Sequence, residues 1–194
     1  MSIEEAVNAL RRNELVIYPT ETVYGIGGDA LNEGTVEKVF KAKKRPFSKP
    51  ISMGVSSVET ARRYTEPGDD AVEFMREFLP GPVTPIVPKT DEVPDVLTAG
   101  SEKVGIRVPD DETALELLGR FEPITSTSAN ISGGESARRV DELDEIREKV
   151  EVVIDAGECQ YGQGSTVVDT TTETWEVVRE GAMAGEVRKW MDGR

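Results

Sequence analysis

The sequence contains no histidine and a single cysteine, Cys159. Without histidine, the side chain that most often transfers protons near neutral pH is missing, and so are Ser-His and Cys-His nucleophile pairs. One cysteine cannot form an internal disulfide, and zinc lacks its preferred nitrogen and sulfur ligands. A bound metal should therefore be a hard ion held by oxygen atoms, such as Mg²⁺. Catalysis must use carboxylates, lysine, arginine, hydroxyl groups or the substrates themselves.

Basic residues and long apolar runs are also scarce. The 194 residues include 23 Lys and Arg against 37 Asp and Glu, which gives a formal net charge of −14. Such a chain repels polyanions, so nonspecific nucleic-acid binding would require a local concentration of basic residues. No apolar stretch approaches the roughly 20 residues that span a bilayer, and the acidic start MSIEEAVNALRR is unlike a secretory leader. We expect a cytoplasmic protein with one domain, residues 1–194.

Helical and strand patterns alternate along the chain. Ser2 and Glu5 have capping-box spacing before a first helix that ends near Asn13. Further helices are predicted at about 35–43, 58–64, 70–78, 113–118 and 140–150, and short strands at 15–18, 51–55, 104–108, 124–127 and 152–154. Two strands joined by a polar turn are predicted near the end, with Trp175 on the second. The segment PGPVTPIVP has too many prolines for a regular central strand. The alternation predicts an α/β layer structure.

The densest cluster of positive charge is the segment KAKKRPFSKP. It places five cationic side chains around a turn fixed by proline: Lys41, Lys43, Lys44, Arg45 and Lys49. Cationic residues at the end of a helix commonly complement its dipole, and on this segment alone that explanation is favoured. The alternative is a phosphate clamp, in which Arg45 offers a planar fork of donors and the lysines supply mobile charges.

Two segments combine hydroxyl side chains with glycine. Residues 20–28 include two threonines, Glu21 and three glycines, which suits close backbone approach to a ligand. This segment is neither a Walker A loop nor a GxGxxG fingerprint. TSTSANISGG begins in a predicted strand and continues to the mouth of an α/β sheet, where ligands commonly lie. Each segment is also explained by an ordinary turn.

Two arginines, Arg107 in VGIRVP and Arg179 in EVVREG, interrupt otherwise apolar runs. An arginine within a strand usually lies on the solvent-facing side, which is the simpler expectation for both. The alternative is that each reaches a carboxylate or phosphate from a rigid element. Ser165 and Thr166, at the end of GQGST, likewise form either a turn or a ligand clamp.

The order of these segments is more specific than any one of them. PTETVYGIGGDA, KKRPFSKPI, PGPVTPIV, VGIRVP, TSANISGG and finally GSTVVD with VVREG resemble the YrdC family of L-threonylcarbamoyladenylate synthases over residues 15–181. The resemblance implies a twisted, mixed parallel and antiparallel sheet flanked by helices, around a large concave cavity with a positive interior. It also implies a nucleotidyltransferase that forms threonylcarbamoyl-AMP and pyrophosphate from L-threonine, bicarbonate or CO₂, and ATP, for threonylcarbamoyladenosine modification of tRNA.

Site residues are implied by their positions in the family's motifs. The residues implied for threonine are Thr22, Arg107, Ser128 and Ser165, with Arg107 holding the carboxylate. Those implied for ATP are Arg45, Lys49, Lys103, Asn130, Ser136 and Arg179. Lys43 and Arg45, from the K-x-R-P element, would be catalytic, and no residue is expected to be a dedicated metal ligand.

The sequence departs from the family's pattern in two places. Gly54 stands where relatives often have histidine, so that part of the threonine pocket must be completed differently. SARR replaces the more usual Ser-Pro-Thr pattern at Ser136. The chain is also expected to end before the additional C-terminal domain of longer relatives.

The implied reaction needs no protein nucleophile. The threonine amine captures CO₂ as a carbamate, whose oxygen attacks the α-phosphorus of ATP, with Mg²⁺ sharing the phosphate charge. The product would pass to a separate tRNA threonylcarbamoyltransferase, while the net charge disfavours direct tRNA contact. The main alternative is a non-catalytic RNA-binding module of the same fold. A carbamoyl-transfer role, as in hydrogenase-maturation proteins, and dihydroxybutanone-phosphate synthase are further alternatives, but the K-x-R-P and SAN elements favour the adenylate-forming branch.

Overall fold

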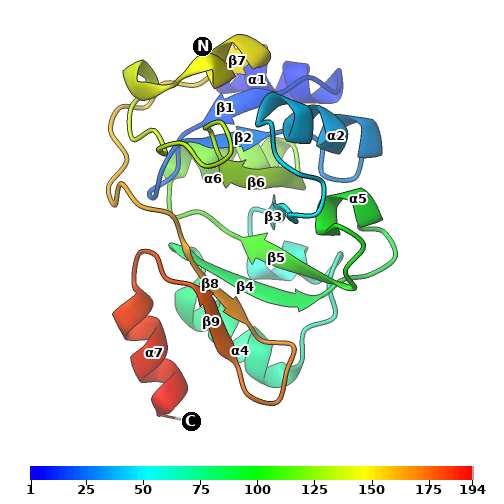
Figure 1. Ribbon diagram of the computed structural model, residues 1–194, viewed down its shortest axis with the longest axis vertical. Coiled ribbons are helices and arrows are strands. Elements are labelled where there is room, and N and C mark those ends of the chain that lie inside the picture. Colours follow the sequence, from blue (N-terminus) through cyan, green and yellow to red (C-terminus); the bar gives the residue numbers. More distant parts are fainter. Residues whose placement is uncertain (194) are drawn as a thin grey trace.

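The computed structural model describes residues 1–193; Arg194, the last residue of the expected single domain, lies outside the described residues. The strands are β1 (Val16–Tyr18), β2 (Gly25–Gly27), β3 (Ser52–Gly54), β4 (Val83–Pro88), β5 (Lys103–Arg107), β6 (Ile124–Ser128), β7 (Val152–Val153), β8 (Thr166–Asp169) and β9 (Glu176–Arg179). Within the described range these nine strands form one sheet, in the order β7-β1-β2-β6-β3-β5-β4-β8-β9 (Figure 1).

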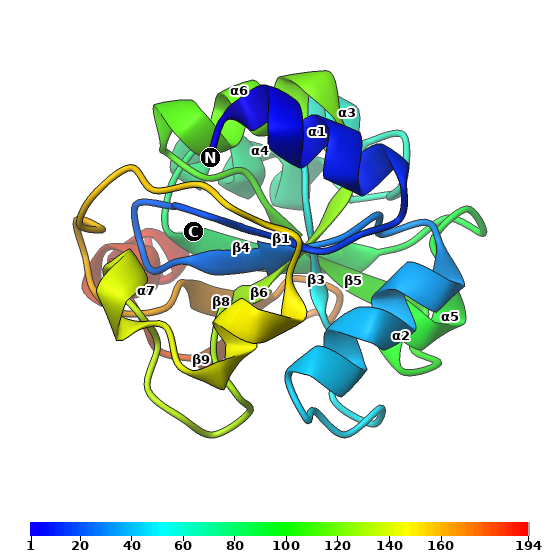
Figure 2. The same ribbon diagram turned by 90° about the horizontal axis from the view of Figure 1, so that it is seen from above.

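The sheet is mixed and twisted, as predicted. β1 with β7, β3 with β5 and β4 with β8 are parallel pairs, and the remaining neighbours are antiparallel. Seen from above, the strands are strongly rotated relative to one another (Figure 2). All five strands predicted singly, from the strand at 15–18 to that at 152–154, are present with ends shifted by one residue.

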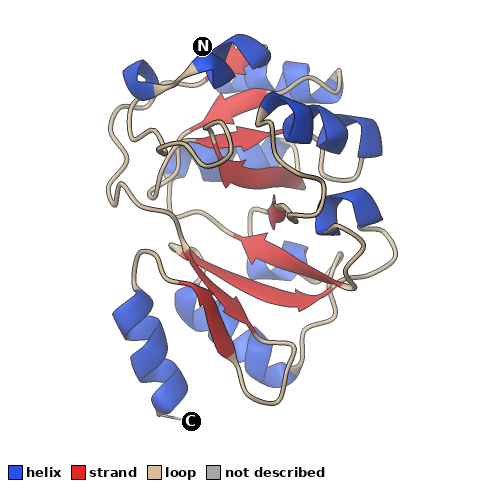
Figure 3. Cartoon of the chain, in the orientation of Figure 1, coloured by secondary structure: helices blue, strands red, loops and turns tan. Residues whose placement is uncertain are grey.

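Helices cover the sheet on both faces (Figures 2 and 3). They are α1 (Ile3–Arg11), α2 (Glu33–Ala42), α3 (Val58–Ala61), α4 (Asp69–Phe78), α5 (Asp95–Thr98), α6 (Glu112–Arg120) and α7 (Ala184–Asp192). The predicted capping box of α1 is present: Ser2 Oγ accepts from the Glu5 amide at 3.2 Å, and the Glu5 carboxylate accepts from the Ser2 amide at 2.6 Å. None of these helices, over residues 1–193, has the length and apolarity needed to cross a membrane.

The apolar run around β1 is continuous because both faces of this strand are covered. Val16 packs into a cluster with Leu10 of α1 and Leu117 of α6, whereas Ile17 packs into a second cluster with Phe40 of α2. Burying each such side chain contributes roughly 1.5–3 kcal/mol. The two clusters hold β1 rigidly between helices, and the loop that follows β1 contributes to the cavity described below.

The expectation that PGPVTPIVP is not a regular central strand is wrong, because β4 lies between β5 and β8. Pro85 pairs with β8, but pairing with β5 begins only at Ile86. Pro88 pairs with β5, but pairing with β8 ends at Ile86. Each proline therefore lies in a ladder with one neighbour only, so its missing N–H removes no hydrogen bond from a ladder with the other neighbour.

The helix predicted at 140–150 is also wrong. The chain forms two 3₁₀ turns, η1 (Val140–Glu142) and η2 (Glu145–Lys149). Between them, Asp144 accepts hydrogen bonds from the amides of Ile146, at 2.8 Å, and Ile131, at 3.2 Å. The carboxylate thus binds backbone N–H groups in a non-helical conformation and interrupts the helix.

The C-terminal part of the chain contains an unpredicted helix, α7. The two predicted strands are β8 and β9, but Trp175 precedes β9 by one residue instead of lying on it. Trp175 stacks on Trp190 of α7 with ring centroids 6.1 Å apart, and both indoles make T-shaped contacts with Phe74 in α4. These aromatic contacts attach α7 to the β8–β9 end of the sheet.

Candidate functional site

A cavity of about 620 Å³ extends from the β1–β2 loop, across β5, to β9. Four cationic side chains line it: Arg45, Lys103, Arg107 and Arg179. Among the described residues of its lining, Glu180 is the only one with an acidic side chain. In a chain of net charge −14, this lining is locally cationic and suits an anionic ligand.

Most of the predicted site residues meet in this cavity. Those that line it are Thr22, Arg45, Lys103, Arg107, Ser128, Ser136, Ser165 and Arg179. Lys43, Lys49 and Asn130 are not part of the lining. The structure thus brings together residues separated by up to 157 positions, from Thr22 to Arg179, on either side of β5.

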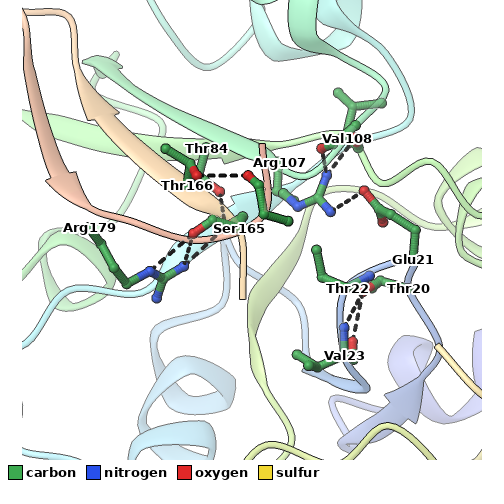
Figure 4. Close-up of polar contacts among 12 residues, drawn as sticks. Thr20, Glu21, Thr22, Val23, Thr84, Arg107, Val108, Ser165, Thr166 and Arg179 are labelled. Atoms are coloured by element: carbon green, nitrogen blue, oxygen red, sulfur yellow. Dashed lines mark hydrogen bonds and ion pairs between the residues drawn. The ribbon is translucent and has the colours of Figure 1, made fainter. Parts of the chain in front are cut away.

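Arg107 is buried, so the simpler expectation that it faces solvent is wrong. Its strand, β5, has neighbours on both sides, and the residue is only 4% exposed. Nη1 donates to the carbonyls of Gly81 and, at 2.9 Å, Val108, and Nη2 donates to Glu21 Oε1 at 2.5 Å (Figure 4). These contacts fix the guanidinium at the wall of the cavity.

The loop between β1 and β2 presents a set of oriented hydroxyls opposite Arg107 (Figure 4). Thr20 Oγ1 donates to the Val23 carbonyl at 2.7 Å and accepts from the amides of Thr22 and Val23, both at 3.2 Å. The Thr20 and Thr22 hydroxyls are 2.7 Å apart. Since the single proton of Thr20 is used on Val23, the Thr22 hydroxyl donates to Thr20 and keeps lone pairs that can accept from a ligand.

A second set of hydroxyl side chains lies across the cavity, between β4, β8 and β9. Ser165 Oγ is 2.7 Å from Thr84 Oγ1 and accepts from Arg179 Nη2 at 3.0 Å. Arg179 also donates from Nη2, at 2.9 Å, to the Ser165 carbonyl (Figure 4). Arg179 is exposed, as the simpler expectation has it, and it also lines the cavity.

The arginines are close enough to perturb one another. Although Arg179 as a whole residue is exposed, the protein around its guanidinium partly desolvates it, and this desolvation and then the charge of Arg107 lower the pKa of Arg179. Burial and then the charge of Arg179 lower the pKa of Arg45. An anion placed between these side chains would relieve that repulsion, so the electrostatics favour a phosphate or carboxylate ligand.

Lys43, predicted to be catalytic, lies beneath the cavity and is 1% exposed. Its ammonium donates to the Ser128 carbonyl, to the Asn130 carbonyl at 2.9 Å and to Asn130 Oδ1 at 3.2 Å. Asn130 in turn accepts from Ser128 Oγ at 2.6 Å. In this structure Lys43 and Asn130 therefore hold the Ser128 loop in place, which the sequence pattern did not indicate.

The surroundings of Lys43 give a prediction for the dependence of stability on pH. Burial and the charge of Arg45 lower the pKa of Lys43 from 10.5 to about 8. Between these values the unfolded chain binds more protons at this position, so the Lys43 contribution to stability rises with pH. In urea denaturation, the free energy of unfolding of the wild type should therefore increase relative to that of Lys43→Met as the pH is raised from about 7.5 to about 10. A difference that stays constant would contradict the lowered pKa.

Lys103, Arg45 and Lys49 are held differently from Lys43. Lys103 pairs with Asp169 and remains part of the cavity wall. Arg45 donates from Nε to the Lys49 carbonyl at 2.9 Å and from Nη2 to the Pro50 carbonyl at 2.8 Å. Lys49 contributes its backbone to this turn while its side chain is exposed, outside the cavity lining.

Several lining residues were not predicted, among them Tyr18, Thr84 and Ser126. Tyr18 fits because glycine follows on the paired strand: a Cβ at Gly25 would lie 3.0 Å from its ring. Burial raises the pKa of Tyr18 to about 12. The glycine pattern of β2 was a usable signal for a bulky neighbour in β1.

Gly54, the departure from the family's pattern, is the last residue of β3 and pairs with Arg107 of β5. A Cβ there would meet Ser126 Cβ at 3.5 Å, which is ordinary van der Waals contact. Gly54 itself is not in the cavity lining, whereas Ser126 is. Ser126 is therefore the lining residue that lies next to Gly54.

Among residues 1–193 no three His, Cys, Asp or Glu side chains are grouped so that they could hold a metal ion. The lining offers hydroxyls and the carboxylate of Glu180. This donor set fits an ion such as Mg²⁺ that arrives coordinated by phosphate oxygens and water, and not a dedicated protein cage.

The sequence and the fold were compared with those of known protein families. A family model for Sua5, YciO and YrdC proteins, described as telomere recombination, matches residues 8–181. The chain belongs to the Sua5/YciO/YrdC family. Among curated members, the threonylcarbamoyl-AMP synthase of Pyrococcus abyssi is 38% identical over 184 residues, covering 93% of this chain and 54% of that protein. A Methanocaldococcus jannaschii protein, provisionally given the same name, is 41% identical over 171 residues, covering 88% and 81%.

Solved structures of this family have the same fold. P. abyssi Sua5 complexed with L-threonine superposes with a TM-score of 0.92 at 36% identity, covering 98% of this chain and 57% of that one. Escherichia coli YciO gives a TM-score of 0.83 at 28% identity, covering 93% and 89%. The chain thus spans most of YciO and the M. jannaschii protein, and little more than half of the P. abyssi protein.

Proposed function

We propose that this chain is an L-threonylcarbamoyladenylate synthase, which forms threonylcarbamoyl-AMP and pyrophosphate from L-threonine, bicarbonate or CO₂, and ATP. The observation that carries the proposal is the meeting of Arg45, Arg107 and Arg179 with oriented hydroxyls in one cavity. Relatives that bear the name threonylcarbamoyl-AMP synthase are 35–41% identical over most of the chain, and one neighbouring structure contains L-threonine.

In this function the cavity divides into two parts. Thr22, Arg107, Ser128 and Ser165 form the threonine pocket, with the Arg107 guanidinium binding the carboxylate. The ATP side comprises Arg45, Lys103, Ser136 and Arg179 in the wall, with Lys49 and Asn130 at its margin. Lys43 supports this side from beneath, because its ammonium binds the backbone on which Ser128 and Asn130 lie.

The reaction then proceeds by placing anions side by side. The threonine ammonium loses one proton to water, the neutral amine attacks CO₂, and the adduct loses a second proton to water, which gives a carbamate. A carbamate oxygen attacks the α-phosphorus of ATP, and the bond from the α-phosphorus to the α,β-bridging oxygen breaks, which releases the β- and γ-phosphates as pyrophosphate. Arg45 and Arg179 neutralise the charge that develops on the phosphates, a contribution that depends on preorganised donors and not on a nucleophilic side chain.

Other components are part of the same proposal. Mg²⁺ bound to ATP would share the phosphate charge, and the hydroxyls and the Glu180 carboxylate of the lining are the protein oxygens that could contact it. The product leaves for a separate tRNA threonylcarbamoyltransferase in the cytoplasm, so this chain supplies activated threonylcarbamate for tRNA modification without a requirement for direct tRNA binding.

The deciding experiment is detection of threonylcarbamoyl-AMP by mass spectrometry after incubation with ATP, Mg²⁺, L-threonine and bicarbonate. Product should form only in the complete mixture, with pyrophosphate released in equal amount. Each substrate is omitted in turn as a control. Absence of product from the complete mixture, together with RNA binding by the same preparation, would favour the non-catalytic RNA-binding alternative.

A further inference from the structure

Lys103 and Asp169 form an ion pair between two strands that are not neighbours. Lys103 begins β5 and Asp169 ends β8, while β4 lies between these strands in the sheet. Lys103 is in register with Pro88 of β4, and Asp169 is in register with Ile86. The lysine side chain therefore reaches across β4 toward β8. Since Ile86 and Lys103 both line the cavity, this side chain runs along the cavity wall.

The Asp169 carboxylate is held in one orientation by the turn that follows β8. Its Oδ1 accepts from the Thr171 amide at 3.0 Å and from the Thr171 hydroxyl at 2.6 Å, and its Oδ2 accepts from Lys103 Nζ. Burial alone would raise the pKa of Asp169, but the hydrogen bonds from Lys103 and Thr171 lower this pKa below its usual value. Asp169 is therefore a fixed anion at neutral pH, with a side chain that is 13% exposed.

The Lys103 ammonium retains one donor for a ligand. An ammonium has three N–H groups. One is donated to Asp169, and a second is donated to Thr171 Oγ1 at 3.4 Å. The third has no partner among the described residues, on a side chain that is 40% exposed and lines the cavity. Because the first two N–H groups are directed at β8 and the turn after it, the place from which the third can be donated is fixed.

Stability gives little reason for this ion pair. Pairs with a well exposed partner typically contribute about 0–1 kcal/mol to the free energy of unfolding. The Asp169 charge also opposes the binding of an anion, because it offsets the positive charge of Lys103 in a cavity that is otherwise lined by Arg45, Arg107 and Arg179. The remaining effect is geometric: an ammonium at the end of a flexible four-carbon chain is confined to one place.

We propose that Asp169 is a positioning residue, which holds the Lys103 ammonium where negative charge develops on the phosphates as pyrophosphate leaves. The inference rests on the proposed function and adds to the ATP side a residue that does not itself contact ATP. Donors placed in advance for developing charge act mainly on the transition state, whereas the attraction for bound ATP comes from all the cations of the wall. Loss of the Asp169 charge should therefore slow turnover without weakening ATP binding.

The test is Asp169→Asn, which keeps an Oδ1 acceptor for Thr171 and removes the charge that binds Lys103. With all substrates saturating, kcat for pyrophosphate release should fall at least about fivefold. The dissociation constant of Mg²⁺-ATP, measured by calorimetry without threonine, should stay equal or become up to about threefold smaller, because one repelling charge is gone. A general disturbance of the site would weaken ATP binding as well. That outcome, or a wild-type kcat, would overturn the inference.

A double-mutant cycle tests whether Asp169 acts through Lys103. In the Lys103→Met background, Asp169→Asn should change kcat by less than about twofold. An equal loss in both backgrounds would contradict the proposal. Asp95→Asn is the matched control, because Asp95 binds Lys89 Nζ at 2.9 Å and neither residue is in the cavity lining. This variant should keep the wild-type kcat and ATP affinity.

A second variant leaves both charges in place. Thr171→Val removes the hydroxyl that donates to Asp169 Oδ1 and accepts from Lys103, and it should lower kcat at least about twofold with unchanged ATP affinity. Product formation by the wild type, with wild-type kcat in Asp169→Asn and Thr171→Val, would reject the role of Asp169 alone. Failure of the wild type to form threonylcarbamoyl-AMP would reject the proposed function, and the role of Asp169 with it.

Discussion

Replacing Arg107 with alanine is expected to lower the free energy of unfolding by about 3–5 kcal/mol and to abolish threonine-dependent product formation. The stability loss follows because Glu21, 4% exposed, would keep a buried charge without its partner. The carbonyls of Gly81 and Val108 would lose a donor as well. Urea denaturation measures the first effect, and mass detection of threonylcarbamoyl-AMP measures the second.

A double variant separates folding from function. Arg107→Met with Glu21→Leu removes both charges together and should recover much of the lost stability, since apolar replacements of a buried ion pair are often tolerated. It should remain inactive. Any residual activity of Arg107→Ala should show a threonine requirement raised far more than the ATP requirement. Equal changes in both requirements, or activity of the double variant, would remove Arg107 from the threonine pocket.

The sheet could be predicted from local patterns where burial is similar on both faces of a strand. The apolar run at β1 identified its strand because Val16 and Ile17 enter different clusters. β4 could not be predicted in this way. The acceptability of Pro85 depends on where pairing with β5 begins, and this register is a property of the assembled sheet and not of the segment.

The 3₁₀ turns at 140–149 illustrate the same limit. Their apolar spacing is helical, but Asp144 binds the amide of Ile131, thirteen residues earlier in the chain. A contact of this kind competes with helix formation and has no signature within the segment itself. The short capping box of α1, by contrast, involves only Ser2 and Glu5, and it could be read directly.

It was easier to predict which residues belong to the site than where each of them lies in the folded structure. The resemblance indicated both Arg107 and Lys43, whereas residue type alone favoured the solvent-facing side of a strand for Arg107 and a solvated helix end for the segment that contains Lys43. Arg107 is buried because β5 is an interior strand, and Lys43 is buried because the Ser128 loop folds over it. Glu21 was visible in the sequence only as one residue of a loop, since its ion pair depends on Arg107, 86 positions away.

Replacing Arg45 with alanine is expected to reduce kcat/KM for ATP by at least about 30-fold, or about 2 kcal/mol of transition-state stabilisation. Arg45 lines the cavity beside Arg179 and also fastens the turn that follows, through the carbonyls of Lys49 and Pro50. Lys49 is also implied for ATP by the resemblance, but its side chain is exposed outside the cavity lining, so Lys49→Ala should cause a smaller loss than Arg45→Ala.

Two further variants identify which property of Arg45 matters. Lys41→Ala removes one positive charge from the same segment, at an exposed position paired with Glu37, and should leave ATP-dependent pyrophosphate release near the wild-type rate. Arg45→Lys keeps the charge but loses the planar fork that holds two carbonyls. If the fork is required, Arg45→Lys will be nearly as impaired as Arg45→Ala; if charge suffices, it will recover most of the activity. If Arg45→Ala has the wild-type kcat/KM for ATP in pyrophosphate release, Arg45 does not bind the phosphates, and its proposed place on the ATP side of the cavity is excluded.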